Sequence, residues 1–337
     1  MLSKIVINTK HLQDNLNYIK KHCSGNICAM VKANAYGHGI ETVVPLLSGQ
    51  VSAFGVVNVE EAVAVRQLDE DTKVIIFGVC NDIETAIRYD VSLSITSVDE
   101  LYKIVDVYKK CKQAPRLHLN INTGMNRFGI QDKKDLQRII RILQKNKLNL
   151  EGIFTHFSSL TTDDDYTKHQ KDMFDDFVHS LPKSICPIVH VGGGNSIYEF
   201  KEYDMYRVGM FLYSGVKQAL SVQSQIVAIQ NVKKGEHVGY MCAYTADKDM
   251  KVGVVPLGYN DGIKRGLSNN FTVKINGKEC KNVGNVCMDC FMVEIDKKVK
   301  VGDEVVVMED AKNWADKLGT TEYEILTNFN SFRGERI

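Results

Sequence analysis

The chain has 337 residues, of which 44% are hydrophobic and 25% charged, and its formal net charge is +1. This length suits one large domain with a smaller one, or two medium domains, of a soluble globular protein. The balanced charge gives no reason to expect nucleic acid or an anionic membrane as a partner. The N-terminal segment lacks an apolar signal core, and no run is long enough to span a bilayer. We therefore predict a cytoplasmic protein with neither nucleic-acid nor membrane partners.

Between about residues 26 and 209, short β-rich runs alternate with charged stretches that have helical spacing. The helical stretches are 59–68, 98–112, 133–146 and 166–180. The β-rich runs are NICAMVKA, SAFGVVNV, KVIIFGV, VSLSITS, RLHLNIN, LEGIFTHF, PIVHVGG and MYRVGMFL. Eight apolar strands that alternate with helices predict parallel βα units and an α/β fold, a (β/α)8 TIM barrel. A doubly wound open sheet is the main competing architecture.

After about residue 220, strand-like runs continue, but short Gly-, Asn- and Asp-rich turns replace the long helices. The dipeptide Asn276-Gly277 between FTVKI and KECKNV is a hairpin signal, and a short helix is expected at 312–318. The C-terminal third is therefore predicted to be an antiparallel β domain. The expected division is a barrel over residues 8–219 and a β domain that comprises residues 220–337 together with an N-terminal strand at 1–7.

Nine cysteines are scattered along the chain, and in the cytosol they would stay reduced. Cys287 and Cys290 form one CxxC pair. No second ligand pair lies at a matching spacing, so the pair does not indicate a metal site. The segment VCMDCFMVEI alternates like a strand, whereas a redox pair would open a helix. We interpret both residues as packed cysteines and predict no metal site.

The residues that follow each barrel strand are expected to meet on the catalytic face. Lys32 ends the first buried strand, where an ammonium is costly unless the amine reacts, for example as a Schiff base; the alternative is a lysine that reaches water. The run Gly192-Gly193-Gly194 followed by Ser196 suggests a phosphate site after the seventh strand. Together they imply pyridoxal 5'-phosphate or, nearly as well, a phosphorylated sugar in an aldolase.

Five segments in order resemble the alanine racemase family. AMVKANAYGHG is similar to its cofactor-lysine motif. The others are LHLNINTGMNRFG with Arg127, YRVGMFLY with Arg207, GYMCAYTA followed by VVPLGYNDG with Tyr240, and GNVCMDCFMVEI with Met288. These matches spread over nearly the whole chain, so the chain is identified as a member of this family by resemblance.

The resemblance implies that Lys32 holds pyridoxal 5'-phosphate and serves the face on which D-alanine carries its α-proton, while Tyr240 serves the L-face. Arg207, a permanent donor, would face the pyridine nitrogen and leave it unprotonated. His156 would link Tyr240 to Arg207. The remaining residues would bind the cofactor's phosphate (Tyr36, Ser196 and the Gly209 backbone) and the substrate (Arg127, Tyr259 and Met288).

The resemblance also implies an isomerase that interconverts L-alanine and D-alanine and supplies D-alanine for peptidoglycan. It implies a homodimer in which each β domain completes the active site of the partner subunit. A racemase of broader specificity, for example for serine, is the close alternative. A decarboxylase of ornithine or diaminopimelate type and a cofactor-carrier protein share the barrel, but the match around Tyr240 disfavours the former, and carriers lack a second domain.

Three positions depart from the family pattern. Asn120 replaces a lysine that becomes carbamylated and orients the arginine, so either an anion such as chloride fills that space or Arg127 is held less firmly. Asn122 replaces a common aspartate. Phe332 replaces a phosphate-binding tyrosine, which predicts weaker cofactor retention. Separately, His118 lies within a strand and is expected to be a satisfied core histidine.

Overall fold

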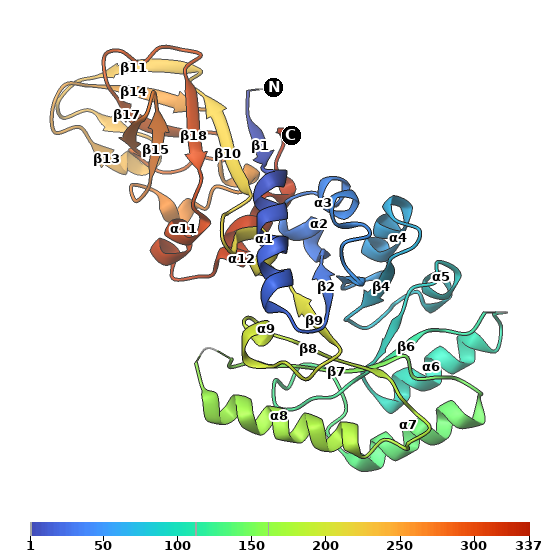
Figure 1. Ribbon diagram of the computed structural model, residues 1–337. Helices are drawn as coiled ribbons and strands as arrows, with labels where there is room; N and C mark the ends of the chain where they lie inside the picture. Colours follow the sequence, from blue (N-terminus) through green and yellow to red (C-terminus); the bar gives the residue numbers. More distant parts are fainter. Residues whose placement is uncertain (1, 112, 161) are drawn as a thin grey trace. The chain divides into compact units, whose positions relative to one another are not determined.

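The computed structural model describes residues 2–111, 113–160 and 162–337, and the chain separates into two compact units (Figure 1). We call residues 13–35 and 40–216 the barrel unit. We call the N-terminal segment to residue 12, residues 36–39 and residues 217–337 the β unit. The first helix, α1 (Thr9–His22), runs through the boundary between them.

The barrel unit contains a sheet of eight parallel strands in the order β4-β3-β2-β9-β8-β7-β6-β5. The two end strands of this order also meet, because Ile75 and Ser92 form a parallel bridge. There the amide of Ile76 donates to the carbonyl of Ser92 at 2.9 Å. The predicted barrel is therefore confirmed, and the open sheet is excluded. The strands are β2 (Asn26–Met30), β3 (Ala53–Val56), β4 (Lys73–Ile76), β5 (Leu93–Ile95), β6 (Leu117–Asn120), β7 (Gly152–His156), β8 (Ile188–Gly192) and β9 (Met205–Val208).

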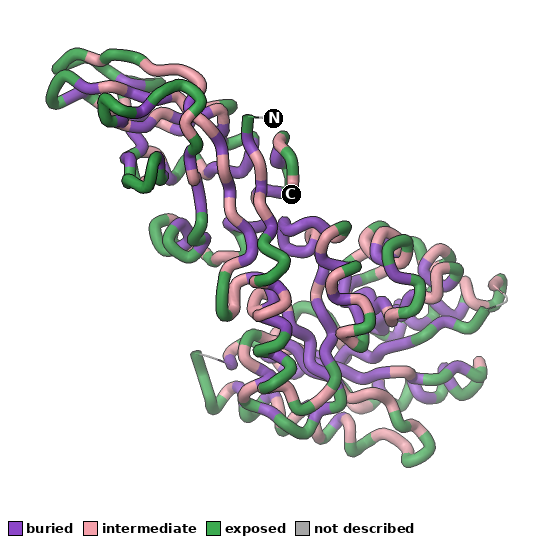
Figure 2. The backbone as a smooth tube through the Cα atoms, turned by 45° about the horizontal axis from the view of Figure 1, so that its top comes forward, coloured by how far each residue is buried: buried purple, intermediate pink, exposed green. Residues whose placement is uncertain are grey.

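Helices connect these strands, and several begin at a side-chain cap that fixes where the helix starts. For example, the carboxylate of Asp163 accepts from the amide of Tyr166 at 2.9 Å, so α8 starts two residues before its predicted position. Residue 112, the predicted end of α6, lies outside the described residues. The helices are α3 (Ile40–Leu47), α4 (Val59–Leu68), α5 (Ile83–Arg88), α6 (Val98–Tyr108), α7 (Lys133–Lys145), α8 (Asp164–His179), α9 (Ser196–Glu199) and α10 (Met210–Ser214). Figure 2 shows the buried strands among half-exposed helices.

The β unit contains a six-stranded sheet in the order β16-β15-β18-β10-β1-β19, a three-stranded sheet β11-β14-β17, and the pair β12-β13. All pairings are antiparallel except that of β1 with β19. The strands are β1 (Lys4–Ile7), β10 (Leu220–Gln225), β11 (Ala228–Val232), β12 (His237–Val238), β13 (Tyr244–Thr245), β14 (Met250–Val255), β15 (Thr272–Ile275), β16 (Lys278–Lys281), β17 (Phe291–Ile295), β18 (Glu304–Met308) and β19 (Glu335–Arg336). Two helices follow β18: α11 (Ala311–Leu318) and α12 (Glu322–Thr327). The described part of the chain contains no helix that combines the length and the apolar character needed to cross a membrane.

The expectation that the CxxC pair lies within a strand is wrong. β17 begins only at Phe291, and the preceding residues form a turn in which the amide of Cys287 donates to the carbonyl of Cys290 at 2.9 Å. The carbonyl of Cys287 accepts from the amide of Tyr259 at 3.0 Å, so it is occupied by another loop rather than by a neighbouring strand. Burial raises the pKa of the Cys290 thiol to about 11, which agrees with a packed cysteine.

The predicted hairpin at Asn276-Gly277 joins β15 to β16, and its two turn residues have φ of 50° and 75°. Positive φ at both positions is what a type I′ turn requires. We expect Gly277→Ala to destabilise the β unit by about 1 kcal/mol, because alanine disfavours this backbone region. Trp314, the single tryptophan, is buried in α11 and reports on this unit, so its fluorescence during urea unfolding measures the change. Glu279→Ala on the same hairpin is the control, with an expected effect within about 0.5 kcal/mol.

Candidate active site

Lys32 stands two residues after β2 and opens the short helix α2 (Lys32–Tyr36). The four residues after it, 33–36, have φ between 52° and 54°, which is a left-handed turn built without glycine. Each such residue costs roughly 1–2 kcal/mol. The carboxylate of Glu61 offsets part of this cost, since it accepts from the amide of Ala33 at 2.7 Å and from that of Val57 at 3.0 Å. Strain of this kind, held in place by its surroundings, is typical of functional sites.

The environment of Lys32 favours its neutral amine. Partial burial lowers the pKa of Lys32, the positive charge of Arg127 lowers it further, and the carboxylate of Glu61 opposes both. A lysine must lose its proton before it can attack a carbonyl group. Its setting therefore suits a nucleophile or a proton acceptor better than a lysine that merely reaches solvent.

Arg207 of β9 is buried inside the barrel between two aromatic rings. Its Cζ lies 4.9 Å from the ring centres of both Phe77 and Phe154. Phe154 lies in β7 and Phe77 directly follows β4. These two strands are not neighbours in the sheet, so the rings meet across the barrel interior. Burial lowers the pKa of Arg207 to about 9, so the guanidinium keeps its charge at neutral pH.

The terminal nitrogens of Arg207 are fully engaged. Nη1 lies 3.1 Å from Nδ1 of His190 and 3.4 Å from its carbonyl oxygen. Nη2 lies 2.6 Å from the carbonyl oxygen of Thr155 and 3.4 Å from Nδ1 of His156. These four acceptors account for all four Nη hydrogens. Among the residues that the structure describes, the Nε–H has no partner, which leaves one directed donor for a bound group.

The contact with Arg207 sets the tautomer of His156. A guanidinium only donates, so Nδ1 of His156 must accept and Nε2 must carry the proton. Burial, followed by the charges of Arg207, Arg127 and Lys32, lowers the pKa of His156 to about 3. At neutral pH this ring is therefore neutral and presents an Nε2–H donor.

The segment after β8 has the features expected for a phosphate cradle. Gly193 has φ of 127°, and a Cβ built on it would lie 2.6 Å from the carbonyl oxygen of Phe157. The hydroxyl of Ser196 is buried and has no hydrogen-bond partner in the described chain. Gly209 follows β9, the neighbour of β8, and Gly192 is paired with Arg207, so both segments leave the same end of the sheet. An orphaned buried hydroxyl fits an acceptor group such as phosphate.

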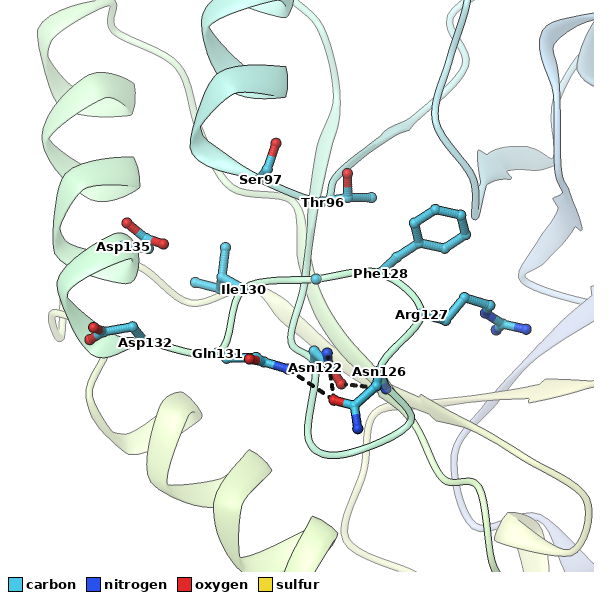
Figure 3. Close-up of a pocket in the computed structure, with 11 residues that line it drawn as sticks. Thr96, Ser97, Asn122, Asn126, Arg127, Phe128, Ile130, Gln131, Asp132 and Asp135 are labelled. Atoms are coloured by element: carbon cyan, nitrogen blue, oxygen red, sulfur yellow. Dashed lines mark hydrogen bonds between the residues drawn. The ribbon is translucent and has the colours of Figure 1, made fainter.

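Arg127 lies on an exposed loop after β6, and no described side chain pairs with it (Figure 3). Asn122 shapes this loop, because its side-chain oxygen accepts from the amides of Gly124 at 3.1 Å and Asn126 at 2.9 Å. The departure at Asn122 therefore keeps the acceptor that an aspartate would offer. Asn120 is buried, and among the described contacts no hydrogen bond joins it to Arg127.

The β unit carries the other predicted site residues. Tyr240 opens a 3-10 turn and is 71% exposed, and Met241 and Cys242 beside it have φ of 63° and 51°. The amides of Tyr259 and Asn260 donate to the carbonyls of Cys287 and Met288 at 3.0 and 3.1 Å. The structure thus brings the Tyr259 and Met288 loops together, and both side chains are exposed. Tyr36 is buried beside the ring of Tyr323 at 5.9 Å.

An ion-pair clasp that the sequence did not reveal holds these two loops. Arg333 pairs with both oxygens of Asp261 at 2.6 and 2.7 Å and with Asp289 at 2.7 Å. Asp261 belongs to the Tyr259 loop and Asp289 to the Met288 loop. In the sequence, only the aspartate within GYNDG, Asp261, suggested a charged contact at this loop, and nothing indicated that Arg333 is its partner. Phe332, next to Arg333, is buried in the β unit.

A lysine whose pKa is lowered by burial and by Arg127, a charged buried donor and an orphaned hydroxyl occupy one end of a parallel barrel. Each of these groups fits a part of one cofactor, namely its aldehyde, ring nitrogen and phosphate. The fold and the site therefore define the class of barrel enzymes that bind pyridoxal 5'-phosphate through a lysine.

Comparisons with known proteins identify the family within this class. The family described as alanine racemase, N-terminal domain, matches residues 7–216, and alanine racemase, C-terminal domain, matches residues 219–337. The alanine racemase of Borreliella burgdorferi (strain ZS7) is 33% identical, over 97% of this chain and 95% of its own length. The chain belongs to the alanine racemase family, whose enzymes are pyridoxal phosphate-dependent isomerases.

Solved structures agree with this assignment. The alanine racemase of Clostridium difficile 630 superimposes with a TM-score of 0.92 at 30% identity, covering 97% of this chain and 93% of the other. That of E. faecalis gives a TM-score of 0.92 at 28% identity, covering 99% and 97%.

The opposing charges around Lys32 generate a prediction about its titration. Arg127→Gln removes a positive neighbour and should raise the pKa of Lys32, so the neutral amine appears only at higher pH. Glu61→Gln removes a negative neighbour and should shift the pKa in the opposite direction. In cofactor-free protein, borohydride trapping of pyridoxal on Lys32, quantified by peptide mass spectrometry across a pH series, measures both shifts. If the pKa of Lys32 moved in the same direction in both variants, the assigned effects of Arg127 and Glu61 would be contradicted.

Proposed function

We propose that this chain racemises alanine by a two-base mechanism in which Lys32 and Tyr240 act on opposite faces of the substrate. The observation that carries the proposal is the buried Arg207, whose Nε–H has no partner among the described residues and is therefore a directed donor that fits an acceptor such as an unprotonated ring nitrogen. Ser196, Tyr36 and the Gly209 amide would bind the phosphate, and Lys32 would hold the aldehyde carbon. When bound, pyridoxal 5'-phosphate withdraws electrons from Cα and acidifies the α-proton of the amino acid.

Arg207 would favour inversion at Cα over side reactions such as transamination. Its guanidinium has no proton acceptor and stays charged, so the nitrogen that it faces remains unprotonated. By keeping that nitrogen unprotonated, Arg207 would limit how strongly electrons are withdrawn from Cα and so would favour prompt return of a proton to Cα. The Nζ of Lys32 would exchange the proton on the face where D-alanine carries it.

On the L-face, the Oη of Tyr240 would exchange the proton. An unperturbed tyrosine has a pKa of about 10, too high for an efficient base near neutrality. The Nε2–H of His156 would donate to Oη and favour the phenolate, as would the positive charges of Arg207 and Arg127. The tautomer that Arg207 imposes on His156 is the one this role requires.

The substrate carboxylate would bind to the unpaired guanidinium of Arg127, while Tyr259 and the Met288 backbone close the pocket around the small side chain. Because Asn120 gives Arg127 no anchoring charge, the pocket tolerates some variation in the amino acid. L-serine is therefore the second substrate to test.

We also propose a cytoplasmic homodimer in which residues 8–219 bind the cofactor and residues 220–337, with strand 1–7, complete the partner's site. The exposure of Tyr240, Tyr259 and Met288 in the β unit supports this, since a proton-transferring tyrosine needs an environment that excludes water. The product D-alanine would supply peptidoglycan synthesis.

The basic experiment follows L-alanine in the cofactor-loaded protein by chiral chromatography. We expect both enantiomers in equal amounts at the end point. A cofactor-loaded protein that racemises L-serine but not alanine would transfer the proposal to that substrate, and one that racemises neither would refute it.

Tyr240→Phe should separate the two half-reactions. The variant lacks the L-face base, so racemisation should fall by about 10²–10⁴-fold, the usual contribution of a positioned acid or base. Exchange of the α-proton of D-alanine with deuterated water should persist, because Lys32 serves that face. Proton NMR measures the exchange; racemisation at the wild-type rate would eliminate Tyr240 as a base.

Mixing two inactive variants tests the shared site. In a heterodimer of Lys32→Ala and Tyr240→Phe chains, one of the two composite sites regains both groups. Random reassortment should therefore restore about a quarter of the wild-type activity, since half the dimers are mixed and each has one intact site. No recovery after verified subunit exchange would place both groups of a site on one chain.

A further inference from the structure

A chain of hydrogen bonds continues from Arg207 down through the barrel, away from the candidate site. Nε2 of His190 lies 2.8 Å from Nδ1 of His118, and Nε2 of His118 lies 3.1 Å from Oε2 of Glu151. Both histidines are fully buried, and Glu151 stands just before β7. The chain thus connects the guanidinium to a carboxylate at the opposite end of the strands.

The register of the strands spaces these hydrogen-bonded side chains regularly along β7. His118 pairs with Gly152, His190 with Phe154, and Arg207 with Gly192, which itself pairs with His156. Positions 152, 154 and 156 share one face of the strand, so each step climbs two residues, or about 6.6 Å. Regular pairing, rather than an accidental contact, therefore sets the path.

Two glycines make room for the chain. A Cβ built on Gly152 would lie 2.1 Å from Nδ1 of His118. A Cβ built on Gly192 would lie 2.6 Å from Nη2 of Arg207. Any other residue at either position would displace the ring or the guanidinium, so the barrel backbone is shaped around these side chains.

The two ends of the chain permit only one arrangement of protons. Arg207 can only donate, so Nδ1 of His190 accepts and its Nε2 carries a proton. The Nε2–H of His190 donates to Nδ1 of His118, and the Nε2–H of His118 donates to Glu151, which as a carboxylate can only accept. Burial lowers the pKa values of both histidines, and both rings are neutral in this arrangement.

Glu151 is a stable end point for the chain. Ser92 donates to Oε2 at 2.7 Å, and the ammonium of Lys73 lies 2.6 Å from the other oxygen, Oε1. These contacts, with the hydrogen bond from His118, lower the pKa of Glu151 and keep it ionised. Lys73 and Arg116, whose Nη1 lies 3.2 Å from Oε1, balance the charge of the carboxylate without taking part in the path of hydrogen bonds.

We infer that His118 and Glu151 are positioning residues for the reaction, which act through His190 to fix the direction in which Arg207 presents its Nε–H. The inference rests on the proposed function, because that donor matters only if it faces a bound ring nitrogen. His118 is thus a satisfied core histidine, as its sequence context predicts, and has a functional role as well.

The first test measures the tautomers directly in substrate-free holoenzyme with ¹⁵N-labelled histidine. We expect NMR to show His118 and His190 each as a single Nε2–H tautomer. In Glu151→Gln the amide can donate as well as accept, so the carboxylate no longer imposes the Nε2–H tautomer on His118. His190 can follow only if Arg207 turns away from its Nδ1, and mixed tautomers at both rings, which we expect, would report that the guanidinium is no longer held in one direction. Lys73→Gln is the matched control: it removes one of the two ion pairs at Oε1 and keeps that of Arg116, leaves the hydrogen bonds through Oε2 intact, and should preserve the wild-type tautomers.

The second test asks whether the chain affects the site. Glu151→Gln and His118→Leu should each raise the dissociation constant for pyridoxal 5'-phosphate about tenfold and lower kcat about tenfold. This is the lower end of the effect seen at metal centres when a residue that hydrogen-bonds to a metal ligand is lost. KM for alanine should change less than kcat, because Arg127 is untouched. His118→Gln should recover most of the loss, since its amide can accept from His190 and donate to Glu151.

Three results would overturn the inference: Nδ1–H tautomers in the wild-type protein, wild-type cofactor affinity and kcat in both Glu151→Gln and His118→Leu, or equal damage from Lys73→Gln. If the wild-type holoenzyme racemises no amino acid, the proposed function fails. The tautomers and the cofactor dissociation constants still decide the inference in that case.

Discussion

The structure depends on one buried guanidinium, that of Arg207. An isolated charge in a barrel interior would cost several kcal/mol or more, yet no carboxylate among the residues that the structure describes pairs with it. Two carbonyls, two neutral imidazoles and two aromatic faces replace the water that it loses. Neutral partners leave the positive charge uncancelled, so its field still acts on whatever binds above it.

The donor-only chemistry of this group organises its neighbours in two directions. Toward the site, it makes His156 an Nε2–H donor. Toward the base of the barrel, it orders His190 and His118 until the proton sequence ends at Glu151. A lysine in place of Arg207 would provide one ammonium nitrogen, and it could not bind four acceptors in a plane while aiming a fifth hydrogen elsewhere. Planarity is therefore as important here as charge.

The sequence predicted the features that local patterns encode. The eight strands followed from apolar runs, α4 from its spacing, and the hairpin from Asn276-Gly277. It could not predict the left-handed turn at 33–36, because alanine and tyrosine do not ordinarily adopt positive φ and asparagine does so as a single residue rather than in a run. The distant carboxylate of Glu61 helps hold that turn. Likewise, the alternation in VCMDCFMVEI suggested a strand, but contacts with the Tyr259 loop use the backbone that a strand would need. The partners of His118 and Arg333 could not be predicted either, because these contacts join residues that lie far apart in the sequence.

The site groups differ in how firmly the chain holds them. Lys32 is fixed by a strained turn that Glu61 supports, and Arg207 by four acceptors within the barrel. Arg127 projects from an exposed loop whose backbone Asn122 orders, while nothing in the described chain grips its guanidinium. The two groups proposed to act at the cofactor are thus held by a supported turn and by a buried strand, where a small displacement is costly. The group expected to meet the substrate carboxylate lies on a loop, where a change in side-chain preference need not disturb the cofactor site. With this separation, a change at Asn120 would affect the substrate loop while Arg207 and its acceptors stay in place.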